Sequence, residues 1–241
     1  MAGALLEVDG LTKRFGGFTA LNGVTLSVKV GERFGLIGPN GSGKTTLINC
    51  VSGVLPVNGG AIRFDGREIT ALPPHQRTRL GIVRTFQIPK PFTSMTVLEN
   101  LGIPLEYAAR TRSRGTDASA EAMEILRVIG LDAKSHLKPA GLTQIEMRKL
   151  ELARAMAARP KLLISDEAMA GLSSAEVDDI LTILFRLNEQ GITIIMIEHI
   201  MRAVMRFSER IVVLDAGNRI AEGTPDEIVR NPAVEKAYLG E

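Results

Sequence analysis

"RFGLIGPNGSGKTT", residues 33–46, is the stretch of the sequence that decides the fold. Its apolar start, residues 33–38, is typical of a buried strand, and a glycine-rich turn then leads into a helical pattern. Three further runs are as uniformly apolar as strands buried on both faces: "KLLIS" (161–165), "ITIIMI" (192–197) and "RIVVLD" (210–215). Because these runs alternate with helical patterns, the sequence predicts an α/β fold with a largely parallel central sheet.

Residues 38–46 match the phosphate-binding pattern G-x-x-x-x-G-K-[ST], placed directly between a predicted strand and a predicted helix. Glycines allow backbone N–H groups to surround phosphate oxygens, and the positive end of the following helix favours an anion. A glycine-rich turn without a ligand is the alternative, and the placement of the motif argues against it. The lysine would contact the β and γ phosphates, and Thr45 would hold Mg²⁺ by its hydroxyl. We therefore expect nucleotide contacts from Gly38, Pro39, Asn40, Gly41, Ser42, Gly43, Lys44, Thr45 and Thr46.

Between residues 88 and 160 the alternation of strands and helices stops. Three helical patterns fill this part of the chain, at 95–110, 119–130 and 145–158. The polar stretch "TRSRGTDAS", residues 111–119, predicts a loop. We therefore expect a single domain, 1–241, in which residues 1–87 and 161–241 form the α/β core and residues 88–160 form an inserted helical subdomain.

Composition and charge argue against several classes of protein. The formal net charge of +2 is too small to indicate nucleic acid or an anionic membrane surface as the main partner. Cys50 is the single cysteine, which excludes an internal disulfide and fits a reducing compartment. The first ten residues lack the features of a signal peptide, and the densest apolar run, 191–197, is far shorter than the ~20 residues that span a bilayer. These features predict a cytoplasmic chain that would reach a membrane only through a partner.

Two acids, Asp166 and Glu167, follow the apolar run of "KLLISDE". Successive side chains of a strand point to opposite faces, so the two acids need not share a role. With a phosphate loop upstream, Asp166 is a candidate to hold Mg²⁺, and Glu167 is a candidate to orient or deprotonate the attacking water. Taken alone, such a pair more often belongs to a turn or a helix cap. The assignment therefore depends on the phosphate loop.

Beyond these motifs, the chain resembles the ATP-binding subunits of ABC transporters over nearly its whole length. The segments "LTKRFGGFTALNGVTL", "FDGREITALPPHQRTRLGIVRTFQ" and "MTVLENL" are similar to the ATPases of branched-chain amino acid importers. The resemblance implies a RecA-like P-loop NTPase core with an antiparallel β part and an inserted helical subdomain. It also implies a head-to-tail dimer that binds two ATP between its subunits and drives two transmembrane permease subunits, with an external solute-binding protein acting indirectly.

Three more functional residues are implied by the resemblance alone. Phe15, in "KRFGG", corresponds to the aromatic residue that stacks on adenine. Gln87, in "RTFQ", corresponds to the glutamine that contacts Mg²⁺ and the attacking water, and His199, in "MIEHI", to the histidine that contacts the γ-phosphate. Without the resemblance, these residues would be a core phenylalanine, an ordinary glutamine and a satisfied histidine. The expected catalytic set is thus Glu167, His199, Gln87 and Lys44, and the expected Mg²⁺ set is Thr45, Gln87 and Asp166.

The stretch "LTQIE", residues 142–146, departs from the family's signature, which resembles L-S-G-G-Q and reaches across the dimer to the partner's γ-phosphate. Thr143 and Glu146 still form a capping box, so a helix should begin here. The glycine pair is missing, and the branched side chain of Ile145 and the charge of Glu146 should keep a phosphate away. A poor signature would damage both sites of a homodimer but only one site of a heterodimer. We therefore expect a heterodimer with a second ABC ATPase.

The function that we expect is ATP hydrolysis, with Mg²⁺, coupled to import of branched-chain or other hydrophobic amino acids. One alternative is a regulatory or scaffold subunit that binds ATP and hydrolyses it weakly, as the altered signature suggests. Another is an importer ATPase for urea, amides or aromatic acids. A soluble ABC ATPase that acts on DNA or ribosomes is disfavoured, because such relatives carry two ATPase units or long coiled-coil inserts. We expect no nucleic-acid partner and a peripheral position on the inner face of the cell membrane.

Overall fold

A computed structural model describes residues 3–86, 88–107 and 118–239, and its larger sheet has six strands in the order β10-β9-β3-β8-β7-β6. Five of these strands are parallel, and β10 runs antiparallel to β9. The four apolar runs singled out in the sequence all lie in this sheet, within a residue or so of their expected bounds. The strands are β3 (Arg33–Ile37), β6 (Ile82–Arg84), β7 (Leu162–Asp166), β8 (Thr193–Ile197), β9 (Arg210–Asp215) and β10 (Asn218–Gly223).

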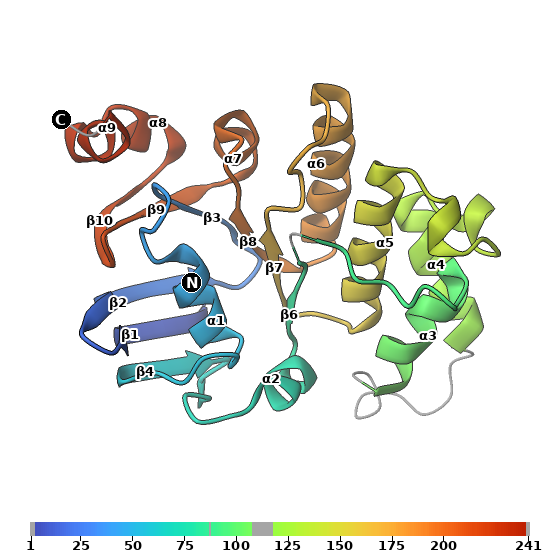
Figure 1. Cartoon of the computed structure of the whole chain (residues 1–241), viewed down its shortest axis with the longest axis horizontal. Helices are drawn as coiled ribbons and strands as arrows, with labels where there is room; N and C mark the ends of the chain where they lie inside the picture. Colours follow the sequence, from blue (N-terminus) through green and yellow to red (C-terminus); the bar gives the residue numbers. More distant parts are fainter. Residues whose placement is uncertain (1–2, 87, 108–117, 240–241) are drawn as a thin grey trace.

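A second, antiparallel sheet has the order β2-β1-β4-β5, as the family resemblance implies. Its strands are β1 (Ala4–Phe15), β2 (Phe18–Lys29), β4 (Gly59–Phe64) and β5 (Arg67–Glu68). Helix α1 (Lys44–Val51) lies beside this sheet in Figure 1, and its buried residues Leu47 and Ile48 share one apolar core with strands of both sheets. The helix that follows the phosphate loop is therefore held between the two sheets.

The opposite face of the parallel sheet is covered by helices. Alternate residues of the strands, such as Leu163 and Ile194, face a second core that contains α6, α7 and the inward sides of α3, α4 and α5. In Figure 1, α3, α4 and α5 lie at the end of the molecule farthest from the antiparallel sheet. The helices are α2 (Pro74–Leu80), α3 (Val97–Tyr107), α4 (Ala118–Ile129), α5 (Gln144–Ala157), α6 (Ser174–Glu189), α7 (Met201–Phe207), α8 (Pro225–Val229) and α9 (Pro232–Leu239), with short 3-10 turns at Asp132–Lys134 and Pro139–Gly141.

The helical stretch predicted for residues 88–160 is present as α3, α4 and α5. The predicted loop at 111–119 extends too far, because Ala118 and Ser119 already belong to α4. The amphipathic pattern of α4 begins there and draws the first turn into the helix. Residues 108–117 lie outside the described part of the chain. The division of the chain at residues 87 and 160 stays a prediction, since the core that contains these three helices continues into α6 and α7.

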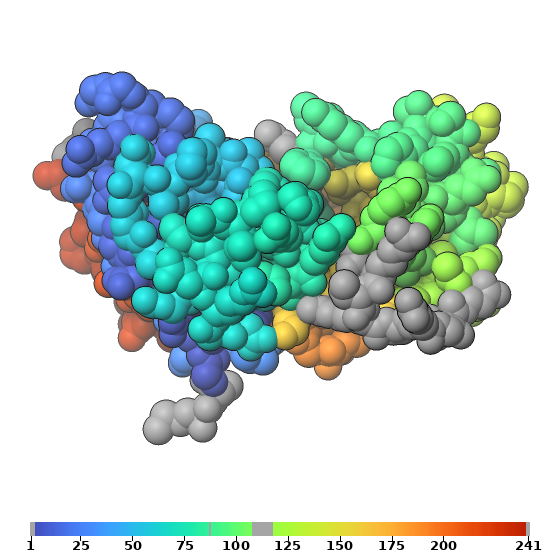
Figure 2. All heavy atoms as spheres, turned by 90° about the horizontal axis from the view of Figure 1, so that it is seen from below, coloured from blue at the N-terminus to red at the C-terminus, as the bar shows by residue number. Residues whose placement is uncertain are grey.

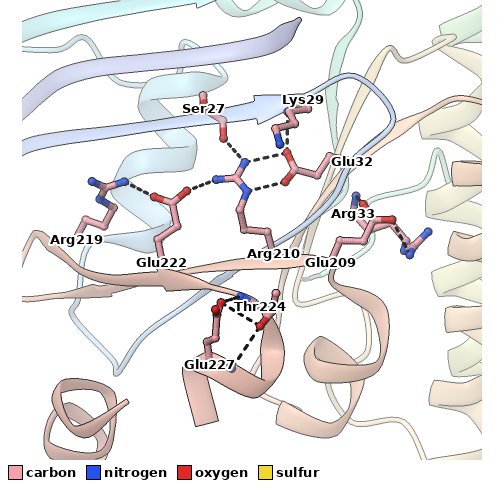
Figure 3. A network of polar contacts seen from close by, with 10 residues as sticks. All are labelled: Ser27, Lys29, Glu32, Arg33, Glu209, Arg210, Arg219, Glu222, Thr224 and Glu227. Atoms are coloured by element: carbon pink, nitrogen blue, oxygen red, sulfur yellow. Dashed lines mark hydrogen bonds and ion pairs between the residues drawn. The ribbon is translucent and has the colours of Figure 1, made fainter. Parts of the chain in front are cut away.

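Buried and half-buried charges join the two sheets next to Thr224 and Glu227 at the start of α8, as Figure 3 shows. Arg210 of β9 donates to both carboxylate oxygens of Glu32, at 2.7 and 2.9 Å, and to the carbonyl of Ser27 in β2, at 2.7 Å. Glu32 also accepts a 2.7 Å bond from the backbone N–H of Lys29. Glu222 of β10 pairs with the other side of Arg210. This network fixes β2 against β3 and β9 at the amino-terminal end of β3, and the phosphate loop starts at the other end of that strand.

Among the helices of the described residues, none combines the length and the apolar character that crossing a membrane requires. Cys50 is buried and free.

Candidate nucleotide-binding site

The phosphate loop leaves β3 and enters α1 in a conformation that requires glycine at two of its positions. Gly38 has φ 149°, and a Cβ on it would lie 2.0 Å from the carbonyl oxygen of Leu214. Gly43 has φ 105°, and a Cβ there would lie 2.8 Å from the carbonyl oxygen of Ala20. Larger residues would clash with backbone in both cases. The motif glycines therefore allow the loop to pack closely against β2 and β9.

The loop is held by its neighbours and leaves the start of α1 open. The backbone carbonyl of Ser42, a buried residue, accepts a 3.0 Å hydrogen bond from the N–H of Gly217. Gly217 in turn accepts from the N–H of Asn22, at 2.9 Å. The residue before α1, Gly43, has no side chain that could cap the helix. The first N–H groups of a helix without a cap can bind an anion, and here they face the cleft that the loop surrounds.

Lys44 is turned toward the loop itself. Its Nζ donates to the carbonyls of Gly38, at 2.7 Å, and Pro39, at 3.0 Å. Burial lowers the pKa of Lys44, while the nearby charges of Glu167 and Asp166 oppose that shift. The ammonium is therefore pre-positioned by two carbonyls that phosphate oxygens can replace as acceptors.

A cleft of about 280 Å³ brings together most of the residues that the sequence pointed to. Phe15 is 46% exposed at its rim, which is unlike a core phenylalanine. Phe18, which pairs with Phe15 across the β1–β2 hairpin, is an exposed aromatic that the sequence argument missed. Gln87 lies outside the described residues, and Gly38, Pro39 and Asp166 are not part of the lining. The cleft is lined by Phe15, Phe18, Ala20, Asn40, Gly41, Ser42, Gly43, Lys44, Thr45, Thr46, Glu167 and His199.

The two acids after β7 have different partners. Asp166 is buried and forms an ion pair with Arg84, the last residue of the neighbouring strand β6. Glu167 has φ 49°, and its Oε1 lies 3.0 Å from Nε2 of His199, which is half exposed. The structure thus separates the carboxylates, as the alternation of side chains in a strand predicts. One carboxylate pairs with Arg84 outside the cleft lining, and the other lines the cleft.

Two further residues near the site were not found from the sequence. Glu198 is 4% exposed at the end of β8, and burial raises its pKa to about 7. Tyr238, in α9, forms a hydrogen bond with the backbone of Gly38, while burial raises the pKa of its hydroxyl. The only sequence signal for Glu198 was a charge next to His199, and for Tyr238 there was none, because nearly 200 residues separate it from the loop.

The start of α5 satisfies two of its own backbone N–H groups through a capping box. Thr143 Oγ1 accepts from the N–H of Glu146, at 3.4 Å, and Oε2 of Glu146 accepts from the N–H of Thr143, at 2.9 Å. The predicted capping box is confirmed. Lys134 Nζ lies 2.7 Å from Oε1 of Glu146, and this contact and the bonds from Thr143 lower the pKa of Glu146. At the two positions where the resembled signature has glycine, this helix start has Gln144 and the partly buried Ile145, and the carboxylate of Glu146 follows them.

Known proteins are similar to this chain over its whole length. The ABC transporter family model matches residues 21–170, more than half of the chain, and the model of the branched-chain amino acid ATP-binding cassette transporter matches residues 218–241. The high-affinity branched-chain amino acid transport ATP-binding protein BraF of Pseudomonas aeruginosa is 41% identical, with 100% of both chains covered. The protein LivG of Escherichia coli, described in the same words, is 39% identical, again with 100% of both chains covered.

Solved structures agree with this relationship. The ADP conformation of MJ1267, an ATP-binding cassette of an ABC transporter, is similar with a TM-score of 0.89 and 34% identity, covering 99% of this chain and 100% of that one. A dimeric bacterial ABC transporter cassette, MJ0796, gives a TM-score of 0.80 and 27% identity, covering 91% and 98%. The expected fold, a P-loop core with an antiparallel β part and added helices, is confirmed. The chain belongs to the ABC transporter family, as an ATP-binding cassette that hydrolyses ATP.

Proposed function

We propose that this cassette powers an importer for branched-chain or other hydrophobic amino acids. The observation that carries the proposal is the joint match of residues 218–241 to the branched-chain model and of the full chain to relatives named for branched-chain transport. In such an importer the solute would be selected by the permeases and an external binding protein, not by this subunit. Urea, amides and aromatic acids are therefore the alternative solutes.

In this proposal MgATP binds in the cleft around the phosphate loop. Phe15 would stack on adenine, and the open first turn of α1 and Lys44 would bind the phosphates. Mg²⁺ would neutralise charge on the β and γ phosphates. The described residues contain no cluster of three His, Cys, Asp or Glu that could hold a metal by itself. That fits Mg²⁺, which binds through one or two protein oxygens and the phosphates, here from Thr45 and Asp166, with Gln87 as a further candidate.

Glu167 is placed to act on the attacking water. It lines the cleft together with the phosphate loop, and its Oε1 lies 3.0 Å from Nε2 of His199. A carboxylate fixed in one orientation can accept or direct the water's proton. His199 is half exposed and can turn from Glu167 toward a phosphate, so we assign it a γ-phosphate contact.

A groove between α2 and α3 is the proposed docking site for a cytoplasmic segment of a permease. It has a volume of about 360 Å³, and it is the hollow between the teal and green atoms of Figure 2. Phe86, Phe92 and Tyr107 line it and remain substantially exposed. Within the described part of the chain, Nε of Arg154 is buried at this groove without an acceptor. An apolar segment with a free backbone carbonyl would match both features. Docking there would hold the cassette at the inner face of the membrane.

The partner ATPase is proposed to be a different chain. The self-capped start of α5 offers little to the partner's γ-phosphate, because the N–H of Glu146 already bonds to Thr143 and the Glu146 carboxylate carries a negative charge there. The chain's own phosphate loop, Asp166, Glu167 and His199 would be completed by an intact signature from the partner. Hydrolysis would then occur mainly at one of two composite sites.

Reconstitution tests the proposed function. The cassette is assembled with its permeases and candidate partner ATPase in vesicles, and ATP-dependent uptake of leucine, urea and an aromatic acid is compared. We expect uptake of leucine, abolished by Lys44→Ala, and much slower hydrolysis by the cassette alone. Uptake of urea or the aromatic acid in place of leucine would contradict the proposed substrate. ATP hydrolysis by the isolated chain as fast as by the assembled complex would argue against the heterodimer.

A weakly hydrolysing regulatory subunit is the second candidate, favoured by the same α5 start. Glu167→Gln separates the two functions. In the importer ATPase this substitution should nearly abolish hydrolysis by the complex, whereas for a regulatory subunit the partner would sustain the rate.

A further inference from the structure

Glu198 is a buried carboxylate at the end of β8, next to His199. Its Oε1 accepts a 2.8 Å hydrogen bond from the backbone N–H of Met169, which lies two residues after Glu167. Burial raises the pKa of Glu198, and the charges of Glu167 and Asp166 add to this shift. Burying a carboxylate in such surroundings lowers the stability of the fold, so an apolar residue at this position would give a more stable core. The carboxylate therefore indicates a role that requires a hydrogen-bond acceptor at this position.

The end of β8 holds the chain on both sides of Glu167. The N–H of Glu167 donates to the carbonyl of Ile197, at 2.8 Å, and the N–H of Met169 donates to Glu198. His199 contacts the Glu167 side chain. Glu167 also has a left-handed φ of 49°, which residues other than glycine keep only where the surroundings fix it. Three consecutive residues of one strand end thus fix both the backbone and the carboxylate of Glu167.

The same segment is held from its other side by α5. Arg148 of α5 donates from Nη2 to the carbonyl of Ala170, at 3.2 Å. Burial lowers the pKa of Arg148, and the charge of Glu198 opposes this shift. Gln144, the first residue of α5, lies so close to Gly171 that a Cβ there would be 2.8 Å from its Nε2. Residues 168–172 are therefore held between β8 and the helix whose start would face the partner's nucleotide.

We propose that Glu198 is a positioning residue that keeps Glu167 directed at the attacking water by holding the N–H of Met169. The inference rests on the proposed role of Glu167 in hydrolysis. The alternative is a polar group that only stabilises the core. The two differ because loss of a positioning group lowers kcat selectively, whereas loss of a core group lowers the stability of the fold.

The test compares three variants of Glu198 in the assembled transporter with a matched control in the same strand. Glu198→Gln keeps an acceptor oxygen, Glu198→Leu removes it, and Glu198→Asp keeps the charge but is too short to reach Met169. The control is Thr193→Val at the other end of β8. Thr193 is fully buried, and its Oγ1 accepts an equally short bond, 2.8 Å, from the N–H of Gly31. The control removes a buried acceptor without contacting the Glu167 segment.

We expect Glu198→Leu and Glu198→Asp to lower kcat by about tenfold, with KM for MgATP changed by less than about twofold. Glu198→Gln should stay within about threefold of the wild-type kcat, and Thr193→Val within about twofold. Amide hydrogen exchange at Met169 is a readout independent of activity, and it should be about tenfold faster in Glu198→Leu but unchanged in Glu198→Gln. The inference is overturned if Glu198→Leu keeps its kcat, if Thr193→Val loses as much, or if Glu198→Gln behaves like Glu198→Leu.

Folding and the proposed function are tested separately from the inference. If Glu198→Leu does not fold, Glu198→Asp decides, and a wild-type kcat in that variant overturns the inference. Lys44→Ala is measured in parallel. Equal rates of ATP hydrolysis by Lys44→Ala and wild type would contradict the proposed function of this site. Amide hydrogen exchange at Met169 would still show whether Glu198 holds residues 168–172. Normal exchange in Glu198→Leu overturns the inference whatever the activity.

Discussion

Arg84 and Asp166 form a buried ion pair across the parallel strands β6 and β7, with Nη2 2.5 Å from Oδ2. Their side chains are only 13% and 9% exposed. Arg84 also donates from Nη1 to the side-chain oxygen of Asn49 in α1, at 2.6 Å. The proposed Mg²⁺ ligand is therefore tied through one guanidinium to the helix that begins at the phosphate loop. A cation bound beside Asp166 would share its carboxylate with Arg84.

Arg84→Met should destabilise the nucleotide-free cassette by about 3 kcal/mol, because it leaves the buried Asp166 without its counter-charge. MgATP should recover part of this loss, since the cation replaces the missing positive charge. Chemical denaturation with and without MgATP measures both effects. The control is Arg127→Met, which breaks the exposed pair with Glu124 and should cost about 0.5 kcal/mol or less. Equal losses in the two variants would contradict the prediction.

Gly38→Ala should abolish MgATP binding. The added Cβ would lie 2.0 Å from the Leu214 carbonyl, so the loop must move away from β9. Gly66→Ala is the matched control, because Gly66 also has a positive φ, 73°, but a Cβ there meets nothing within 4 Å. It should cost about 1 kcal/mol of stability and leave binding intact. Calorimetric titration of both variants is the measurement, and normal MgATP affinity in Gly38→Ala would argue against the tight packing of the loop.

How much of this site the sequence could predict depends on how local each interaction is. Some elements are determined by residues within a few positions of one another, and the sequence predicted them closely. They are the strand before Gly38, the turn that follows it and the helix cap at Thr143. Residues 162–166 were also found, because a strand buried on both faces is uniformly apolar. In such segments the local pattern and the tertiary structure favour the same conformation.

What the sequence did not predict are pairings between distant segments. Arg84 and Asp166 are separated by 82 residues, and Glu198 and Met169 by 29. Each partner is unremarkable in its own segment, and only the order of the strands in the sheet brings them together. The inward turn of Lys44 onto its own loop likewise follows from packing and not from the motif. Such contacts could be predicted only once the strand order was known.

If the proposed heterodimer forms, Glu146→Gln should strengthen ATP binding at the partner's phosphate loop. Glutamine preserves the capping box, so α5 should stay formed. The substitution removes the negative charge and leaves Lys134 without its partner, so the helix start becomes more favourable for a phosphate. Titration of ATP into the heterodimer should show the weaker site tightening by about tenfold. Glu176→Gln, in the equivalent capping box of α6, is the control, and an equal change there would contradict the assignment.

The pH dependence of stability should reveal the buried carboxyl of Glu198. Its pKa rises from an ordinary 4.5 to about 7 in the fold, mainly through burial, with Glu167 and Asp166 adding to the shift and Arg148 as the opposite charge that faces it. Below pH 4.5 the group is protonated in both states. Between pH 4.5 and 7 the unfolded chain releases a proton that the folded chain keeps, so the free energy of unfolding falls as pH rises, and the loss is complete above about pH 7.

Glu198→Gln removes this dependence because an amide does not titrate. The free energy of unfolding of the variant, relative to wild type, should therefore increase by about 2 kcal/mol between pH 5 and pH 8. Urea denaturation at both pH values is the measurement. Glu176→Gln is the control, because hydrogen bonds from Ser173 lower the pKa of Glu176 and place its titration below this pH range. If the free energy of unfolding changes equally with pH in wild type and in Glu198→Gln, the Glu198 carboxylate is already ionised in the folded protein at pH 5. Its charge would then have to be balanced by Arg148 more strongly than burial opposes it.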